Sequence, residues 1–328
     1  MRVIVTGAAG QDGLILGLRL ARAGHEVFGI VRDQEQETLL EKYNPSVTTS
    51  VLDSSNLSKI KRYLEEVQPD QIYHLSAKSS VAKSWQDSEN TLDTNIFHTL
   101  NWLNALNDLK MHSTRFYHAA SSEMFGLPKV FPQTEETLLH PRSPYGVSKV
   151  AAHHLVVNFR ESFGQFASSG ILFNHESPLR KTSFVTRKIT NGVAQIARGV
   201  SDSITLGNLD ISRDWGWAPD YVDGMISILN HDTPDDFILA TGKSHTLKEF
   251  LSIAFQLIGI SHWETYVRFE SSLNRPAEVI SVVGDSSKAR ETLGWNPVTN
   301  FEGMIKQMLD FDLELLDGTD HSLMWKPT

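Results

Sequence analysis

The apolar residues of the first half of the chain fall into short continuous runs separated by longer stretches with helical spacing. The short runs predict strands at residues 2–6 (RVIVT), 26–31 (EVFGIV), 47–52 (VTTSVL), 71–75 (QIYHL), 115–119 (RFYHA) and 169–173 (SGILF). The longer stretches predict helices at residues 14–24, 57–68 and 90–109. Strands that alternate with helices form parallel sheets, so the pattern predicts an α/β fold with a Rossmann-type doubly wound parallel sheet.

The alternation becomes irregular after about residue 174. One further strand-like run, DFILATG at residues 236–242, is expected to return to the sheet. We therefore predict two interleaved lobes. The first is a Rossmann domain of residues 1–173 with a returning segment at about 214–245, and the second is a smaller C-terminal lobe formed mainly by residues 174–328.

Composition and charge narrow the possible functions. The 328 residues carry a formal net charge of -9, which argues against a nucleic-acid or anionic-membrane surface. There is no cysteine, which excludes disulfides, thiolate nucleophiles and zinc sites built on sulfur, and the 13 histidines form no HExxH pair, so we expect no metal site. No run approaches the roughly 20 apolar residues that cross a bilayer. Met1 leads directly into a strand, and we expect a cytoplasmic protein.

A glycine-rich loop follows the first predicted strand. Its sequence, VTGAAGQDG, places Gly7, Gly10 and Gly13 in a GxxGxxG pattern that opens the first helix. Such glycines let the chain turn tightly and let a pyrophosphate approach the free N–H groups at the helix N-terminus. The pattern predicts a dinucleotide site, with a plain structural turn as the alternative.

Two strand ends bear on which dinucleotide binds. A carboxylate after the second strand suits the ribose 2′-hydroxyl of NAD, whereas the 2′-phosphate of NADP needs a cation. Arg32 follows Val31 and favours NADP, although Asp33 and the acidic run DQEQE oppose that choice. After the third strand, Asp53 precedes Ser54 and can accept a hydrogen bond from the adenine amino group; as an alternative, Asp53 caps the helix that follows.

The segment PRSPYGVSK places Tyr145 and Lys149 four residues apart at the start of a helix, hence on one face. A phenol titrates at about 10 in model peptides, too high for a base at neutral pH, but a neighbouring ammonium and a nicotinamide cation favour the phenolate. We expect Lys149 to lower the pKa of Tyr145 and to donate to the ribose hydroxyls of the cofactor. An exposed contact without a role is the alternative.

Two hydroxyls and an acid follow the fifth predicted strand, in the stretch HAASSEMFG. The carboxyl ends of the strands of a doubly wound sheet face the ligand, so Ser121, Ser122 and Glu123 are expected at the rim of the nicotinamide crevice. One hydroxyl and Tyr145 can bind a substrate alcohol that is oxidised. Glu123 is not needed for oxidation and suits removal of a proton from the carbon beside the new ketone. A strand-end cap or an ion pair is the alternative for Glu123.

These motifs together resemble the extended short-chain dehydrogenase/reductases, and most closely the GDP-mannose 4,6-dehydratase family. The similarity extends over nearly the whole chain, and its most specific segments are NHESP, VTRKIT, RDWG and RPAEV. The resemblance implies a tightly held NADP, favoured over NAD, that is reduced and reoxidised within one turnover. It also implies a GDP-sugar substrate.

The resemblance further implies the chemistry of each catalytic residue. Tyr145 would take the proton of the sugar 4-hydroxyl while hydride leaves C4, with Ser121 bonded to the same oxygen and Lys149 supporting the phenolate. Glu123 would remove the C5 proton and assist the departure of water from C6, and the hydride would return to C6. The product would be a 4-keto-6-deoxy sugar nucleotide.

The same resemblance assigns binding residues, the first lobe holding mainly NADP and the second mainly the sugar nucleotide. The cofactor positions are Gly7, Gly10, Gln11, Asp12, Gly13, Arg32, Asp53, Ser54, Ser79, Lys149, His175 and Arg180. The sugar-nucleotide positions are Ser79, Ser122, Asn174, Lys188, Arg213, Arg275 and Glu278. The cations among the latter would meet the diphosphate, and Glu278 a ribose or the base.

Several residues depart from the family pattern. Ser121 stands where threonine is usual, Arg32-Asp33-Gln34 replaces Arg-Arg-Ser, and Lys181 replaces a glycine. These changes leave open a GDP-manno-heptose in place of GDP-mannose. We expect a homodimer through the helices after the fourth strand and at the Tyr–Lys pair, with a homotetramer as the alternative. A nucleotide-sugar 4-reductase or 4-epimerase, or a binding protein without turnover, are the competing functions.

Overall fold

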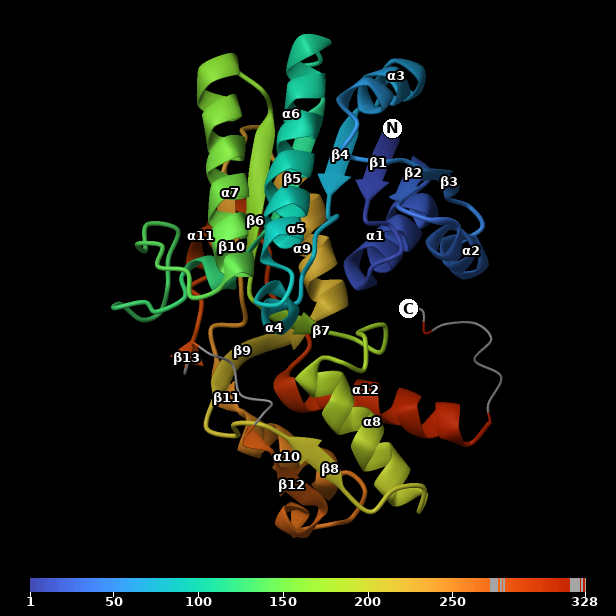
Figure 1. Ribbon diagram of the computed structural model, residues 1–328, viewed down its shortest axis with the longest axis vertical. Helices are drawn as coiled ribbons and strands as arrows, with labels where there is room; N and C mark the ends of the chain where they lie inside the picture. The colour runs from blue at the N-terminus through green and yellow to red at the C-terminus, as the bar shows by residue number, and fades with distance from the viewer. Residues whose placement is uncertain (272–276, 278, 280, 319–324, 326, 328) are drawn as a thin grey trace.

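The computed structural model describes residues 1–271, 277, 279, 281–318, 325 and 327. Two residues of the predicted substrate site, Arg275 and Glu278, lie outside this part of the chain. Figure 1 shows a large sheet with helices on its faces, above a smaller group of helices and short strands from the second half of the chain.

Within the described residues, seven parallel strands form the large sheet, in the order β10-β6-β5-β4-β1-β2-β3. Their bounds are β1 Arg2–Thr6, β2 Glu26–Val31, β3 Thr48–Val51, β4 Gln71–His74, β5 Arg115–Ser121, β6 Ala167–Leu172 and β10 Asp236–Leu239. The six strands predicted in the first half are present, and the predicted returning strand pairs with β6, Asp236 opposite Ser169. The doubly wound parallel sheet is confirmed.

Helices cover both faces of this sheet because successive side chains of each strand enter opposite cores. Val3 and Val5 of β1 enter one core and Ile4 enters the other, and all three are fully buried. The first core is covered by α1 Gln11–Arg22, α2 Gln34–Tyr43 and α9 Ala218–Asn230. The second core is covered by α3 Leu57–Val67, α6 His98–Asp108 and α7 Pro144–Phe163.

The predicted helix at residues 90–109 contains an irregular turn. Helix α5 Ser88–Leu92 leads through a π-helical turn, Asp93–Phe97, into α6. In this turn the buried Asn95 side chain bonds the backbone of Lys78: Oδ1 accepts from the Lys78 N–H at 2.8 Å, and Nδ2 donates to the Lys78 carbonyl at 3.2 Å. Turns of this kind are frequent at functional sites, and this one supports the loop after β4.

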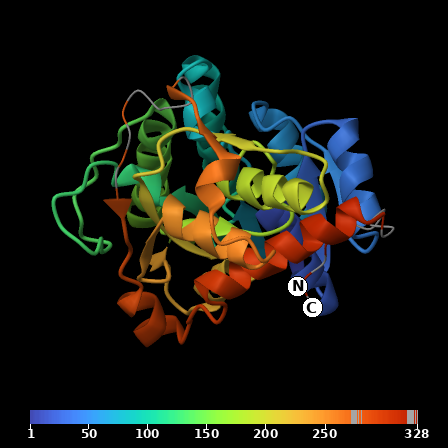
Figure 2. The ribbon, with the colours of Figure 1, turned by 90° about the horizontal axis from the view of Figure 1, so that it is seen from below.

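The second half of the chain forms the lower part of the molecule. Its strands are β7 Asn174–Glu176, β8 Ile204–Leu206, β9 Ser212–Trp217, β11 Ser244–Thr246, β12 Val267–Phe269 and β13 Ser281–Val282. Helices α8 Val185–Ala197, α10 Leu247–Gln256 and α12 Phe301–Leu316 enclose a third core that includes Trp215, Phe250 and Met308. In Figure 2, seen from below, these helices lie in front of the large sheet. No helix in the described part of the chain is both long and apolar enough to span a membrane.

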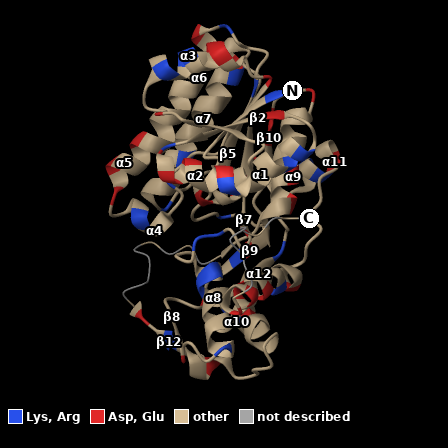
Figure 3. Cartoon of the chain, turned by 90° about the vertical axis from the view of Figure 1, so that its right-hand side faces the viewer, with Lys and Arg blue, Asp and Glu red and all other residues tan. Residues whose placement is uncertain are grey.

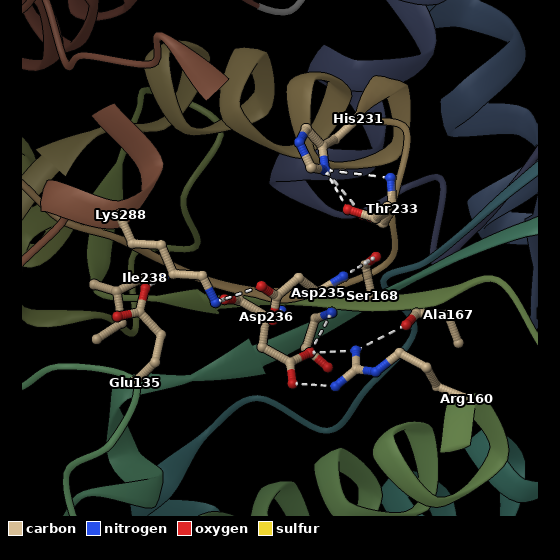
Figure 4. Close-up of polar contacts among 11 residues, drawn as sticks. Glu135, Arg160, Ala167, Ser168, His231, Thr233, Asp235, Asp236, Ile238 and Lys288 are labelled. Atoms are coloured by element: carbon tan, nitrogen blue, oxygen red, sulfur yellow. Dashed lines mark hydrogen bonds and ion pairs between the residues drawn. The ribbon is translucent and has the colours of Figure 1, made fainter. Parts of the chain in front are cut away.

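Strand β10 is anchored to the large sheet by charged side chains (Figure 4). The Arg160 guanidinium donates to both carboxylate oxygens of Asp236, at 3.1 and 2.7 Å, and Asp236 also accepts from the Ser169 N–H at 2.9 Å. On the free edge of the strand, the Glu135 carboxylate accepts from the Ile238 N–H at 2.8 Å. These bonds fix the register of the returning strand and satisfy a backbone donor at the edge of the sheet.

We propose that the two lobes divide between residues 173 and 174. They are interleaved, because the second half of the chain crosses between the two parts of the molecule. The chain runs from β9 into α9 and β10, which pack in the large sheet, and then back to β11. This crossing falls in the expected returning segment. Helix α11 Ser287–Leu293 also packs against α9 and β10, so the C-terminal half contributes one more segment to the Rossmann side than expected.

Candidate active site

The order of the strands reverses between β1 and β4, and the crevice at such a switch point is where ligands bind in open α/β sheets. In Figure 1 the arrowheads of β1 and β4 point toward the lower lobe, so the carboxyl ends of these strands are directed at it. Gly7 follows β1 with a φ of 67°, and a Cβ there would lie 2.9 Å from the Cα and N of Ser76, which follows β4. Only glycine fits this position without a shift of the backbone.

The glycine loop has the form of a pyrophosphate cradle. A Cβ at Gly13 would lie 2.5 Å from the Gly7 carbonyl oxygen, so the loop and the first turn of α1 are packed backbone against backbone. Gly10 stands at the N-cap of α1 and offers no capping side chain. The first N–H groups of α1 therefore suit an anion, and these residues fit a dinucleotide.

Two residues of the first turn of α1 bind the segment that begins with β7. The Asp12 carboxylate contacts Nε2 of His175 at 3.0 Å. Gln11 donates to the His175 carbonyl at 3.2 Å and accepts from the Ser177 hydroxyl at 2.8 Å. The predicted cofactor residues Gln11, Asp12 and His175, which are about 160 positions apart in the chain, thus lie together.

Asp12 and His175 form an ion pair. Burial by itself would lower the pKa of the His175 imidazole, but the charge and hydrogen bond of Asp12 outweigh burial and raise it. Burial would raise the pKa of the Asp12 carboxyl, but His175 outweighs it and lowers that pKa. The His175 ring also stacks on Tyr221, with centroids 4.8 Å apart. The pair joins the glycine loop to β7 by charge.

Arg180 is held beside the same loop by two neighbours. Its Nε lies 3.2 Å from the buried carboxylate of Glu176, and its guanidinium lies 3.9 Å from the centre of the Phe184 ring. The charge of Arg180 lowers the pKa of both Asp12 and Tyr145. Arg180 therefore lies where the dinucleotide cradle meets the catalytic residues.

Tyr145 and Lys149 lie at the buried start of α7, which Ser143 caps by accepting from the Gly146 N–H. The Lys149 ammonium donates to the Ala119 carbonyl of β5 at 2.7 Å and lies 5.9 Å from the centre of the Tyr145 ring. Burial lowers the pKa of Lys149 to about 8. Lys149 is thus bound to the sheet beside the phenol.

Ser121 joins the phenol to the acid. Its Oγ accepts from the Glu123 N–H at 3.3 Å and caps a short 3-10 turn, Ser122–Met124, so the cap considered for Glu123 belongs to Ser121. Ser121 is also hydrogen-bonded to Tyr145. Burial raises the pKa of Tyr145 to about 12; the Ser121 bond opposes the rise, and the charge of Glu123 adds to it. We expected Lys149 to lower the pKa of Tyr145, but Lys149 is not among the main causes of its shift.

The structure decides the alternative for Asp53, which follows β3 where adenine binding is predicted. The Asp53 carboxylate accepts from the Ser55 N–H at 2.9 Å, whereas α3 is capped by Asn56, which accepts from the Lys59 N–H. The alternative of Asp53 as the helix cap is therefore wrong. Ser54 is buried, and its hydroxyl accepts from the Trp102 indole N–H at 3.3 Å.

The predicted substrate residues in the described part of the chain come from several elements of both lobes. Ser122 is buried after β5, Ser79 is exposed in the loop after β4, and Asn174 begins β7. Lys188 lies in α8 and Arg213 in β9. Figure 3 shows basic segments on α8 and in the chain that leads into it, toward the large sheet. The second lobe thus contributes two basic residues, Lys188 and Arg213, to the predicted diphosphate site.

One buried acid was missed by reasoning from the sequence. Asp214 is fully buried and accepts from the Thr241 N–H and hydroxyl at 2.9 and 2.6 Å and from the Gly242 N–H at 2.9 Å. It thereby fixes β9, and with it the neighbouring Arg213, to the end of β10. The sequence held one signal for Asp214: in the segment RDWG it directly follows Arg213, a predicted substrate residue. The described residues contain no cluster of metal-ligating side chains.

The parallel sheet, the glycine cradle and the Tyr145–Lys149 pair with its adjacent hydroxyl define a Rossmann-fold enzyme of the short-chain dehydrogenase/reductase type. The family model for GDP-mannose 4,6 dehydratase matches residues 4–308. The chain belongs to the GDP-mannose 4,6-dehydratase family.

Similar proteins include GDP-mannose 4,6 dehydratase 1 of Arabidopsis thaliana, 42% identical over 325 residues, which cover 95% of this chain and 90% of that protein. The GDP-mannose 4,6-dehydratase of Yersinia enterocolitica is 40% identical, covering 98% and 96%. Among solved structures, the UDP-glucose 4-epimerase of Thermotoga maritima aligns with a TM-score of 0.84 at 21% identity, covering 96% of this chain and all of that one. RMD of Pseudomonas aeruginosa, complexed with NADPH, aligns with a TM-score of 0.81 at 23% identity, with the same coverage. These two structures support the fold.

Proposed function

We propose that the protein dehydrates GDP-mannose to the 4-keto-6-deoxy sugar nucleotide. The observation that carries the proposal is the position of Glu123, in the turn that Ser121 caps and close enough to Tyr145 for its charge to act on the phenol. A reductase or epimerase needs the hydroxyl and the phenol but has no use for this acid. An elimination needs an acid–base group beside them.

A nicotinamide dinucleotide, which we take to be NADP, would be held by the described residues of the first lobe. The N–H groups that follow Gly10 would bind the pyrophosphate, Arg32 the 2′-phosphate, and Lys149 the ribose hydroxyls. Asp12, His175 and Arg180 stand beside the cradle. The bound nicotinamide supplies the acceptor that takes hydride from the sugar C4 and gives it back to C6.

The catalytic side chains divide the proton transfers between them. Ser121 and Tyr145 would bind the 4-hydroxyl oxygen, and the Tyr145 oxygen would take its proton. Because burial raises the pKa of Tyr145 to about 12, the phenol is neutral at rest and needs added positive charge to act as a base. Glu123 would remove the C5 proton and pass it to the departing 6-hydroxyl, which leaves as water. When hydride returns to C6, C5 would regain a proton, balanced by the one released from the 4-hydroxyl.

The diphosphate of the substrate would lie between Lys188 of α8 and Arg213 of β9, each donating to its oxygens. Arg275 and Glu278 keep the roles expected from the family resemblance. We also propose a homodimer through the outer faces of α6 and α7. Phe97, in the turn that leads into α6, and Val147 of α7 are 54% and 46% exposed, and burial of such apolar residues favours association.

The experiment that tests the function is incubation of the purified protein with GDP-mannose, without added reductant, followed by mass spectrometry. Loss of one water without net consumption of NADPH supports the proposal. Loss of water from a GDP-manno-heptose but not from GDP-mannose would keep the mechanism and change the substrate. No loss from either would contradict the dehydratase and favour a reductase, an epimerase or a binding protein.

A further inference from the structure

The end of β2 carries a cation and a carboxylate that are paired with each other. The Arg32 side chain is 75% exposed, and its Nε donates to one Asp33 oxygen at 2.8 Å. The other Asp33 oxygen accepts from the Gln36 N–H at 3.0 Å and so caps α2. The helix end holds the carboxylate in place, and the guanidinium is drawn toward it.

The carboxylate of Asp33 remains charged near neutral pH. Its pKa lies below the usual value, first because the Gln36 N–H donates to it and then because of the bond from Arg32. Glu35 and Glu37 stand in the first turn of the same helix. Residues 32–37 therefore contain one cation and three carboxylates, and of these the Asp33 carboxylate is paired with Arg32.

The two nicotinamide dinucleotides differ at this place. The 2′-phosphate of NADP carries between one and two negative charges at neutral pH, as other phosphate monoesters do, and needs a guanidinium that Asp33 already binds. The same carboxylate repels that phosphate. The 2′-hydroxyl of NAD is neutral and donates readily to a carboxylate at the end of β2.

We infer that Asp33 is a specificity-determining residue of the dinucleotide site: by pairing with Arg32 it lowers the preference for NADP over NAD and lets NAD bind as a competitor. The inference rests on the proposed use of a nicotinamide dinucleotide but not on the identity of the sugar nucleotide. Its rival is that Asp33 serves only as a helix cap. Asn caps a helix as well as Asp does, so Asp33→Asn removes the charge and keeps the cap.

The test is titration calorimetry of NADP and NAD on the full-length protein freed of nucleotide, for the wild type and three variants. Asp33→Asn should bind NADP about three- to tenfold more tightly, with NAD unchanged or weaker, and high salt should reduce the gain. Arg32→Met should remove the preference for NADP. The double variant, Arg32→Met with Asp33→Asn, should show the same NADP-to-NAD affinity ratio as Arg32→Met. Glu35 lies in the same turn but forms no ion pair with Arg32 among the described residues. Glu35→Gln therefore removes an equal charge and should change the NADP-to-NAD affinity ratio less.

An unchanged NADP-to-NAD affinity ratio in Asp33→Asn would overturn the inference, as would an equal change in Glu35→Gln. Thermal unfolding of each variant checks that the cap and the fold are kept. If the wild type bound neither dinucleotide, the proposed cofactor would be wrong as well. Binding of both with no effect of Asp33→Asn would leave the proposed function standing and remove only the inference.

Discussion

Gly146 packs directly against the backbone of Glu123. A Cβ at position 146 would lie 2.7 Å from the Glu123 carbonyl oxygen, a distance that real Cβ atoms do not reach. Gly146 follows Tyr145 at the start of α7, and Glu123 lies in the turn after β5. This contact sets how close the acid lies to the phenol, and it joins the two segments that carry the catalytic residues.

Replacing Gly146 with alanine should lower kcat at least about tenfold, because the added methyl group must push the Glu123 turn away from α7 and a small misplacement of a catalytic group costs much of its effect. Affinity for the dinucleotide should change little. Steady-state kinetics and calorimetry measure the two quantities. Ser162→Ala, at an exposed position of the same helix, is the control and should keep the wild-type kcat. A wild-type kcat in Gly146→Ala would contradict the positioning argument.

Glu123→Gln should lower the rate of dehydration by about a hundredfold or more, the usual contribution of a general acid–base group. The amide keeps the shape of the side chain but cannot take the C5 proton. The rate is followed as loss of water from GDP-mannose by mass spectrometry. Glu136→Gln, at an exposed acid in the next loop, should be active. Unchanged dehydration in Glu123→Gln would show that the proton role is wrong.

The Asp12–His175 pair should make stability depend on pH in a defined window. The pKa of His175 in the folded protein is raised above its ordinary 6.5. The contribution of His175 to the free energy of unfolding is therefore complete below about pH 6.5 and is lost as the pH rises through the pKa of the folded protein. The pKa of Asp12 is lowered below its ordinary 3.8, so its contribution is present above that pH and is lost as the pH falls through the folded value. The pair stabilises most between these two limits.

The measurement is the unfolding midpoint of the nucleotide-free wild type and of His175→Gln at intervals from pH 4 to pH 9. The difference between them should be largest between about pH 4 and pH 6.5 and should shrink at higher pH. A difference that stays constant across this range would mean that His175 acts through packing on Tyr221 rather than through its charge.

Asp214→Asn should destabilise the protein by about 2–4 kcal/mol, because an amide presents N–H groups to buried donors that now meet a carboxylate. The loosening of β9 should also raise KM for GDP-mannose more than it lowers kcat, since Arg213 is the neighbouring residue. Chemical denaturation and steady-state kinetics test both effects. Asp210→Asn, with an exposed carboxylate just before β9, should change stability by less than about 0.5 kcal/mol. Equal stabilities of the two variants would refute the anchoring role.

Local and periodic features of the sequence were enough to determine the sheet and the candidate catalytic residues. The strands from β1 to β6 follow from short runs of strand-forming residues that alternate with helical stretches, and Gly7 from a turn that no other residue fits. That Tyr145 and Lys149 share one face of a helix follows from their spacing, and their proposed roles follow from the resemblance to the family. In each case the physical cause acts over a few neighbouring residues, so it can be recognised from the sequence.

Only the tertiary structure decided how these parts act together. The pairing of Asp12 with His175 and the contact of Gly146 with Glu123 join segments that are distant in the chain and become neighbours through the packing of the sheet and helices. The same holds for the pKa of Tyr145, which burial raises although the adjacent Lys149 suggested the opposite. Desolvation depends on every atom that surrounds a group, and no local pattern records that environment.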